Sequence, residues 1–107
     1  MGKTRFAVVL TESARSDLDE IDAYWTSRGE SWRGRKYIRD LYGAARSELG
    51  DPPTARRGRW VRDCDLDGVR EILVFGVYRI IYEIDEPAAC VSVLSFWHAH
   101  RNAPPLE

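Results

Sequence analysis

The chain has 107 residues and a formal net charge of −1, with 44% hydrophobic and 31% charged residues. This length fits one domain spanning residues 1–107, and the composition is that of a globular protein rather than a disordered tail. No stretch approaches the roughly 20 apolar residues that span a bilayer, and the apolar run 6–10 is shorter than the roughly 7–15 residues of a signal-peptide core, so we expect a cytoplasmic protein that does not enter a membrane.

The overall charge argues against broad nucleic-acid binding, because proteins that neutralise many phosphates are usually clearly basic. Basic residues nevertheless gather in two stretches. One comprises Arg33, Arg35, Lys36 and Arg39, and the other Arg56, Arg57, Arg59 and Arg62. An ordinary solvated face is the simpler interpretation of each stretch.

The two cysteines, Cys64 and Cys90, lie far apart and form no CxxC pair. In a cytosolic protein such residues are usually reduced thiols. No ligand spacing joins them to His98 and His100, so we expect neither a metal site nor any other cofactor.

The first half of the chain predicts a strand and two helices. Residues 5–11 are short and β-rich. Thr11 or Ser13 can cap the following helix, whose apolar residues recur at helical spacing: Ala14, Leu18, Ile21 and Trp25. The carboxylates of Asp17, Asp19, Glu20 and Asp22 mostly occupy its other face, and Gly29 ends it.

A second helix is expected to begin near Ser31 and to stop at Gly50–Pro53. Its apolar stripe comprises Tyr37, Ile38, Leu41, Ala45 and Leu49. Because few residues join the two helices, they should form an antiparallel helical hairpin.

The second half predicts a sheet. After an arginine-rich connection at 54–59, residues 60–64 could form a short edge strand, and residues 69–75, 78–84 and 90–97 give three strong strand patterns. Short turns join these three strands, so they should form an antiparallel meander. The order β-α-α-β-β-β predicts an α+β fold in which the helical hairpin packs on a twisted antiparallel sheet.

A two-residue turn at 76–77 would place Arg70 opposite Glu83 as a cross-strand ion pair. The same register leaves Arg79 without a partner, which makes it a candidate for contact with an anion or a partner protein from the open face of the sheet.

The end of the last strand carries His98, His100 and Arg101. A histidine near an arginine could serve phosphodiester cleavage, with the histidine moving a proton and the arginine stabilising phosphate charge. A polar strand end is an equally good interpretation of the same residues.

These features together resemble the ParE/RelE toxin superfamily over nearly the whole chain. The most specific segment is Tyr78-Arg79-Ile80-Ile81-Tyr82-Glu83-Ile84-Asp85, supported by the helix motif Ala14, Asp17, Leu18 and Ile21, by Asp51-Pro52, by Gly68–Glu71 and by the end of the chain at 97–102. The resemblance implies the fold predicted above. It also implies a toxin of a type II toxin–antitoxin system, with a cognate ParD-like antitoxin whose disordered C-terminal tail wraps the toxin and whose N-terminal part binds operator DNA.

The branches of this superfamily differ in target. ParE-like toxins poison DNA gyrase, whereas RelE-like toxins cut messenger RNA on the ribosome. The acidic net charge, the long helical hairpin and the scarcity of lysines, with only Lys3 and Lys36, favour the ParE branch. A RelE-like nuclease using Arg79, His98, His100 and Arg101 is the alternative, and a non-toxic partner that only co-represses with its antitoxin is a third.

The helices carry more aromatic residues than one sheet face requires: Tyr24, Trp25, Trp32, Tyr37 and Tyr42. Aromatic side chains are over-represented at binding hot spots, so we expect several to stay exposed and to be covered by the antitoxin. With Arg70, Arg79, His98 and Arg101, the residues Trp25, Trp32 and Tyr37 form the predicted set of target or antitoxin contacts. Simple filling of the helix–sheet interface is the other explanation of these rings.

Overall fold

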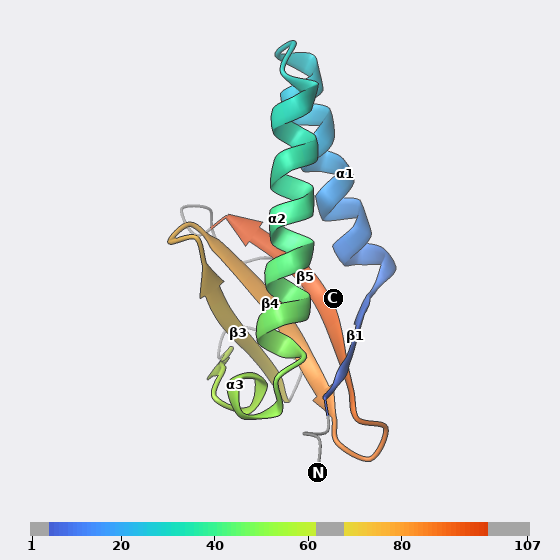
Figure 1. Ribbon diagram of the computed structural model, residues 1–107, viewed down its shortest axis with the longest axis vertical. Coiled ribbons are helices and arrows are strands. Elements are labelled where there is room, and N and C mark those ends of the chain that lie inside the picture. Colours follow the sequence, from blue (N-terminus) through green and yellow to red (C-terminus); the bar gives the residue numbers. More distant parts are fainter. Residues whose placement is uncertain (1–4, 62–67, 99–107) are drawn as a thin grey trace.

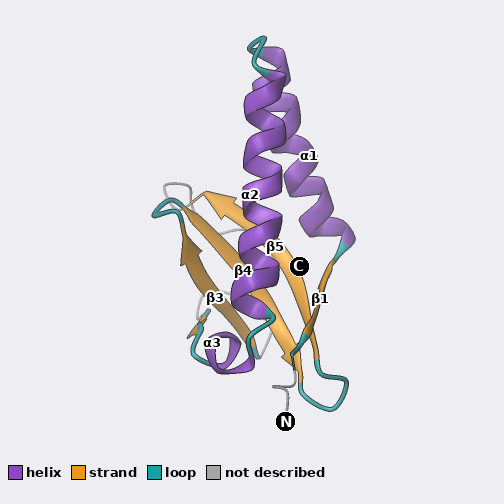
Figure 2. Cartoon of the chain, in the orientation of Figure 1, coloured by secondary structure: helices purple, strands orange, loops and turns teal. Residues whose placement is uncertain are grey.

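The computed structural model describes residues 5–61 and 68–98. Helices cover one face of a five-stranded sheet with the strand order β1-β5-β4-β3-β2 (Figures 1 and 2). The elements are β1 (Ala7–Leu10), α1 (Glu12–Ser27), α2 (Ser31–Leu49), α3 (Pro52–Arg56), β2 (Arg59–Trp60), β3 (Val69–Val74), β4 (Tyr78–Asp85) and β5 (Cys90–His98).

The sheet confirms the predicted α+β fold and the meander of β3, β4 and β5, which pair antiparallel. It is nevertheless mixed, because β1 pairs parallel with β5. A parallel pair needs a long crossover, and here the helical hairpin and the rest of the sheet lie between the two strands in sequence.

The connection after α2 is more ordered than predicted. Pro52 and Pro53 open the short helix α3, where proline suits the first helical positions because its missing N–H would have had no partner. The expected edge strand at 60–64 begins one residue earlier as β2 and pairs with β3, while residues 62–64, including Cys64, lie outside the described part. Cys90 is a half-buried free thiol.

The helical hairpin forms as the sequence predicts. Thr11 caps α1 by accepting a hydrogen bond from the Ala14 N–H at 3.2 Å, so the alternative cap, Ser13, is not used. Ala14 and Leu18 of α1 and Leu41, Ala45 and Leu49 of α2 are buried in the core. The connecting end of the hairpin projects beyond the sheet (Figure 1).

Asp17 departs from the sequence prediction, which placed it among the solvated carboxylates of α1. Its Oδ2 accepts hydrogen bonds from the Ser95 hydroxyl at 2.8 Å and from the Phe96 N–H at 3.0 Å. Its carboxylate therefore fixes α1 to the end of β5.

Tyr82 joins the sheet to α3 from inside the core. Its side chain is fully buried, and its hydroxyl donates a hydrogen bond of 2.6 Å to the Ala55 carbonyl. Burial raises the pKa of this hydroxyl to about 12, so it keeps the proton that it donates at neutral pH.

Among the described residues, no helix has the length and apolar character that crossing a membrane would require.

We predict that Asp17→Ala lowers the free energy of unfolding by about 1–3 kcal/mol, because it leaves the Phe96 N–H and the Ser95 hydroxyl without their acceptor. Asp19→Ala, on the exposed face of the same helix, should change it by less than about 0.5 kcal/mol. Urea unfolding followed by circular dichroism measures both. Equal midpoints for the two variants would contradict the anchoring role.

Candidate functional site

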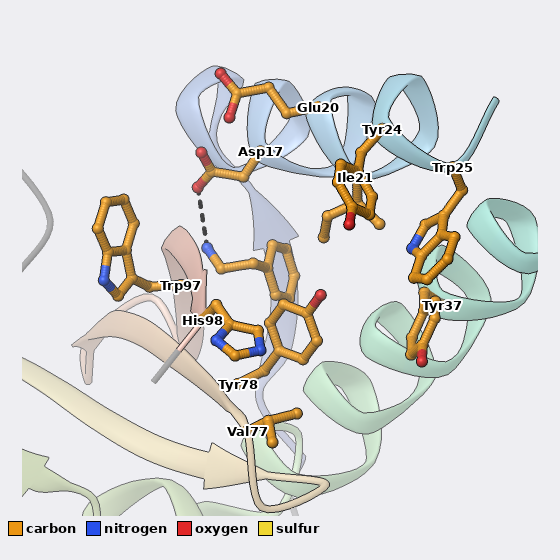
Figure 3. A pocket seen from close by; sticks show the side chains of 11 residues that line it. Asp17, Glu20, Ile21, Tyr24, Trp25, Tyr37, Val77, Tyr78, Trp97 and His98 are labelled. Atoms are coloured by element: carbon orange, nitrogen blue, oxygen red, sulfur yellow. Dashed lines mark hydrogen bonds between the residues drawn. The ribbon is translucent and has the colours of Figure 1, made fainter. Parts of the chain in front are cut away.

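A hollow of about 400 Å³ lies between the helical hairpin and the ends of β4 and β5 (Figure 3). Most of its lining is aromatic: Tyr24, Trp25, Tyr37, Tyr78, Phe96 and His98. We call it the aromatic hollow. Asp17 and Glu20 of α1 add carboxylates to its wall.

A row of rings crosses from the hairpin to the sheet along this hollow. Trp25 meets Tyr24 edge-on at 5.0 Å between ring centroids and stacks on Tyr37 at 5.7 Å. Tyr37 lies 6.5 Å from Tyr78, which meets His98 edge-on at 5.3 Å. Offset and edge-on ring pairs of this kind are favourable beyond the area they bury.

The two helices can approach closely enough to build this row because α2 has a glycine at the crossing. A Cβ on Gly34 would lie 3.0 Å from Asp22 Oδ1 and 3.3 Å from Trp25 Cβ. Tyr37 follows one turn after Gly34 and so comes to lie against Trp25.

The aromatic hollow unites three of the predicted contact residues, Trp25, Tyr37 and His98. Trp32 does not line it, and its side chain is 55% exposed near the connecting end of the hairpin. Tyr24 and Tyr42 are also exposed, so the expectation that several hairpin aromatics remain open to solvent is confirmed.

Arginines of the hairpin lie over several of these rings. The Arg28 guanidinium is 4.5 Å from the Tyr24 centroid, and that of Arg33 is 5.0 Å from Trp25 and 5.2 Å from Trp32. Within the first basic stretch, Arg33 therefore makes cation–π contacts with two rings.

Two candidate nuclease residues, Arg79 and His98, lie on opposite faces of the sheet. Tyr78 pairs directly with His98, and both border the hairpin side, where Tyr78 packs against the core. Arg79 is the next residue and pairs with Trp97, so its side chain points to the other face. The other two candidates, His100 and Arg101, lie outside the described residues.

Arg79 has a partner, contrary to the sequence prediction. Its Nη1 lies 3.0 Å from Oε2 of Glu71, whose side chain is only 7% exposed, and Arg59 binds the other oxygen of the same carboxylate. The Glu71 carboxylate raises the pKa of Arg59 through this hydrogen bond and its charge. The Nε of Arg79 is buried and has no hydrogen-bond partner among the described residues.

The predicted ion pair of Arg70 with Glu83 is wrong, because the loop between β3 and β4 has three residues instead of two. Arg70 pairs with Tyr82, and Glu83 pairs with Val69. Arg70 instead donates a 2.8 Å hydrogen bond to the Gly58 carbonyl, and its guanidinium lies 3.6 Å from the centroid of Trp60.

The outer edge of β3 is open over part of its length. Within the described residues, β2 pairs only with Arg70 and Glu71, so the segment 72–74 has no strand partner on that side. A groove runs there between β3 and α2, next to the exposed side chains of Leu73 and Phe75. Such an edge can accept an additional strand.

Two arginines of the second basic stretch, Arg56 and Arg59, pair with carboxylates of the chain. Arg56 makes two hydrogen bonds, of 2.8 and 2.9 Å, with the Glu86 carboxylate, and this arginine lowers the pKa of Glu86. Arg57 donates to the Pro53 carbonyl, and Arg59 binds Glu71. Arg62 lies outside the described residues.

Residues 8–103 match the family model described as the ParE toxin of the type II toxin–antitoxin system parDE. No curated protein matches the chain. The fold is similar to that of a chain in the crystal structure of the RelBE2 toxin–antitoxin complex from Mycobacterium tuberculosis, with a TM-score of 0.67 and 24% identity over 91% of this chain and 94% of that one. It is also similar to a chain of the chromosomal ParDE system from P. aeruginosa, with a TM-score of 0.69 and 17% identity over 92% of this chain and 100% of that one.

We predict that Arg79→Ala lowers the free energy of unfolding by about 1–3 kcal/mol, because the nearly buried Glu71 loses one of its two arginines. Arg59→Ala is the matched control. It removes the other arginine of the pair, but Arg59 is 78% exposed and should contribute less than about 1 kcal/mol. Denaturant unfolding at neutral pH measures both, and a larger loss in Arg59→Ala would contradict this ranking.

Proposed function

We propose that this chain, which belongs to the ParE toxin family of type II toxin–antitoxin systems, arrests growth by inhibiting DNA gyrase. We further propose that a cognate ParD-like antitoxin neutralises it, and that operator DNA is bound only through that antitoxin.

The separation of Arg79 from His98 is the observation that carries the choice of gyrase over messenger RNA. Phosphodiester cleavage needs the proton-transfer group and the phosphate-stabilising group around one reacting phosphate. Here the sheet lies between the two side chains. Arg79 is moreover held by the Glu71 carboxylate.

Charge supports the same choice. The chain has a net charge of −1, and the arginines at positions 56, 57 and 59 are bonded to groups within the chain. A ribosome-dependent nuclease would have to approach RNA with little positive charge to steer it.

The antitoxin has two suitable surfaces on the described residues. An extended segment can pair with β3 at 72–74, and an amphipathic helix can cover the exposed rings of the hairpin. Both structural relatives come from toxin–antitoxin systems, which supports a partner of this kind.

We predict that the purified protein inhibits DNA supercoiling by gyrase or traps gyrase on cleaved DNA, and that the cognate antitoxin restores supercoiling. In cells, induction without antitoxin should stop labelled thymidine incorporation before labelled methionine incorporation. Cleavage of messenger RNA on purified ribosomes, with gyrase unaffected, would instead establish the nuclease function. An unchanged growth rate would support a non-toxic co-repressor.

We also predict that Trp32→Ala weakens antitoxin binding by at least about 2 kcal/mol, the scale of an interface hot spot, with little loss of stability, because this ring is 55% exposed. Isothermal titration calorimetry measures the affinity. The control is Val9→Ala, since Val9 is 47% exposed but belongs to β1, at the edge of the sheet away from β3. Equal affinities for wild type and Trp32→Ala would contradict this contact.

A further inference from the structure

The aromatic hollow combines two features that attract positive charge. Its wall presents several aromatic rings, whose faces carry partial negative charge, and its only formally charged residues among those described are Asp17 and Glu20. No lysine or arginine of the described residues lines it. Two of its rings, Tyr24 and Trp25, already lie under Arg28 and Arg33, so the exposed carboxylate of Glu20 is the group that attracts a further cation.

Its size suits one side chain rather than a helix. At about 400 Å³ it lies near the lower end of the range for ligand pockets, roughly 300–1,000 Å³. A flat guanidinium can stack on a ring and donate hydrogen bonds to a carboxylate at the same time, which an ammonium group does less well.

The hairpin already uses this type of contact within the chain. Arg28 lies over Tyr24, and Arg33 lies over Trp25. These two rings also belong to the row that borders the hollow. The surroundings of these rings are therefore compatible with a stacked guanidinium.

We infer that the aromatic hollow binds the side chain of one arginine from a partner polypeptide, stacked on one ring of the row and paired with Glu20. Glu20 is exposed on α1, whereas Asp17 is already occupied by Ser95 and Phe96. The hollow thereby selects partner segments with an arginine at one position. The identity of the partner as the antitoxin rests on the proposed function, but the binding of a guanidinium does not.

The test is a titration of the whole protein with N-acetyl-arginine methylamide, followed by the indole N–H signals in nuclear magnetic resonance. The uncharged isostere N-acetyl-citrulline methylamide is the matched ligand. Trp25 borders the hollow, whereas Trp32 and Trp60 do not, and the side chain of Trp97 lies on the opposite face of the sheet, so each spectrum contains its own controls. We expect the Trp25 signal to shift, with the arginine compound binding at least about threefold more tightly than the citrulline compound.

Variants test the role of the carboxylate. Glu20→Gln should weaken binding of the arginine compound about two- to fivefold, and Asp19→Asn, at the neighbouring exposed position, should not change it. Equal binding of the two compounds, equal shifts of all four indoles or equal affinities of the two variants would each overturn the inference. A protein that passes this test but leaves gyrase active would refute the proposed function and not the cation site.

Discussion

The arrangement of the molecule depends on where β1 stops. Its last residue, Leu10, pairs with Val93, so the remaining residues of β5 have no strand partner on that side within the described chain. The amide of Phe96 would otherwise be an unpaired donor in a part-buried position, which is costly. Asp17 accepts its hydrogen bond, and this requirement fixes the first turns of α1 against the end of the sheet.

Because α1 is fixed at its beginning, the positions of the side chains in its later turns are also determined. Leu18 is buried beside Asp17, while Glu20, Tyr24 and Trp25 follow along the wall of the aromatic hollow. Gly34 then allows α2 to approach α1 and stacks Tyr37 on Trp25. The position of the hollow thus follows from one carboxylate and one close crossing of helices.

The hairpin is also polarised in charge. Helix α1 carries five acidic residues and one arginine, whereas α2 carries five basic and two acidic residues. The hollow borders the acidic helix, and the rings with stacked arginines lie around the connecting end. A partner that covers the whole hairpin would therefore need cationic groups near α1 and acidic or aromatic groups near α2, and this pattern is a stronger specificity signal than exposed apolar area alone.

Local patterns in the sequence were sufficient to predict the helices and strands and to predict that several hairpin aromatics are exposed. Helical spacing identified α1 and α2, and β-branched runs identified β3, β4 and β5 within a residue or so. Local patterns could not predict the strand register, which depends on loop geometry, or hydrogen bonds between segments that lie far apart in the sequence. Nothing in the pattern of α1 distinguishes Asp17 from its neighbour Asp19, because its partner Phe96 lies 79 residues away.

The turn between β3 and β4 shows how a small local departure changes a candidate site. Glycine rules favoured a loop of Gly76 and Val77, but Phe75 also leaves the strand and adopts a φ of 52°, a region that side chains other than glycine rarely occupy. This extra loop residue shifts the pairing by one position and so exchanges the faces of β3 relative to β4. Glu71, rather than Arg70, then shares a face with Arg79 and neutralises the arginine that the two-residue turn would have left open to a phosphate. The pairing of Arg79 with Glu71 thus depends on the conformation of one phenylalanine.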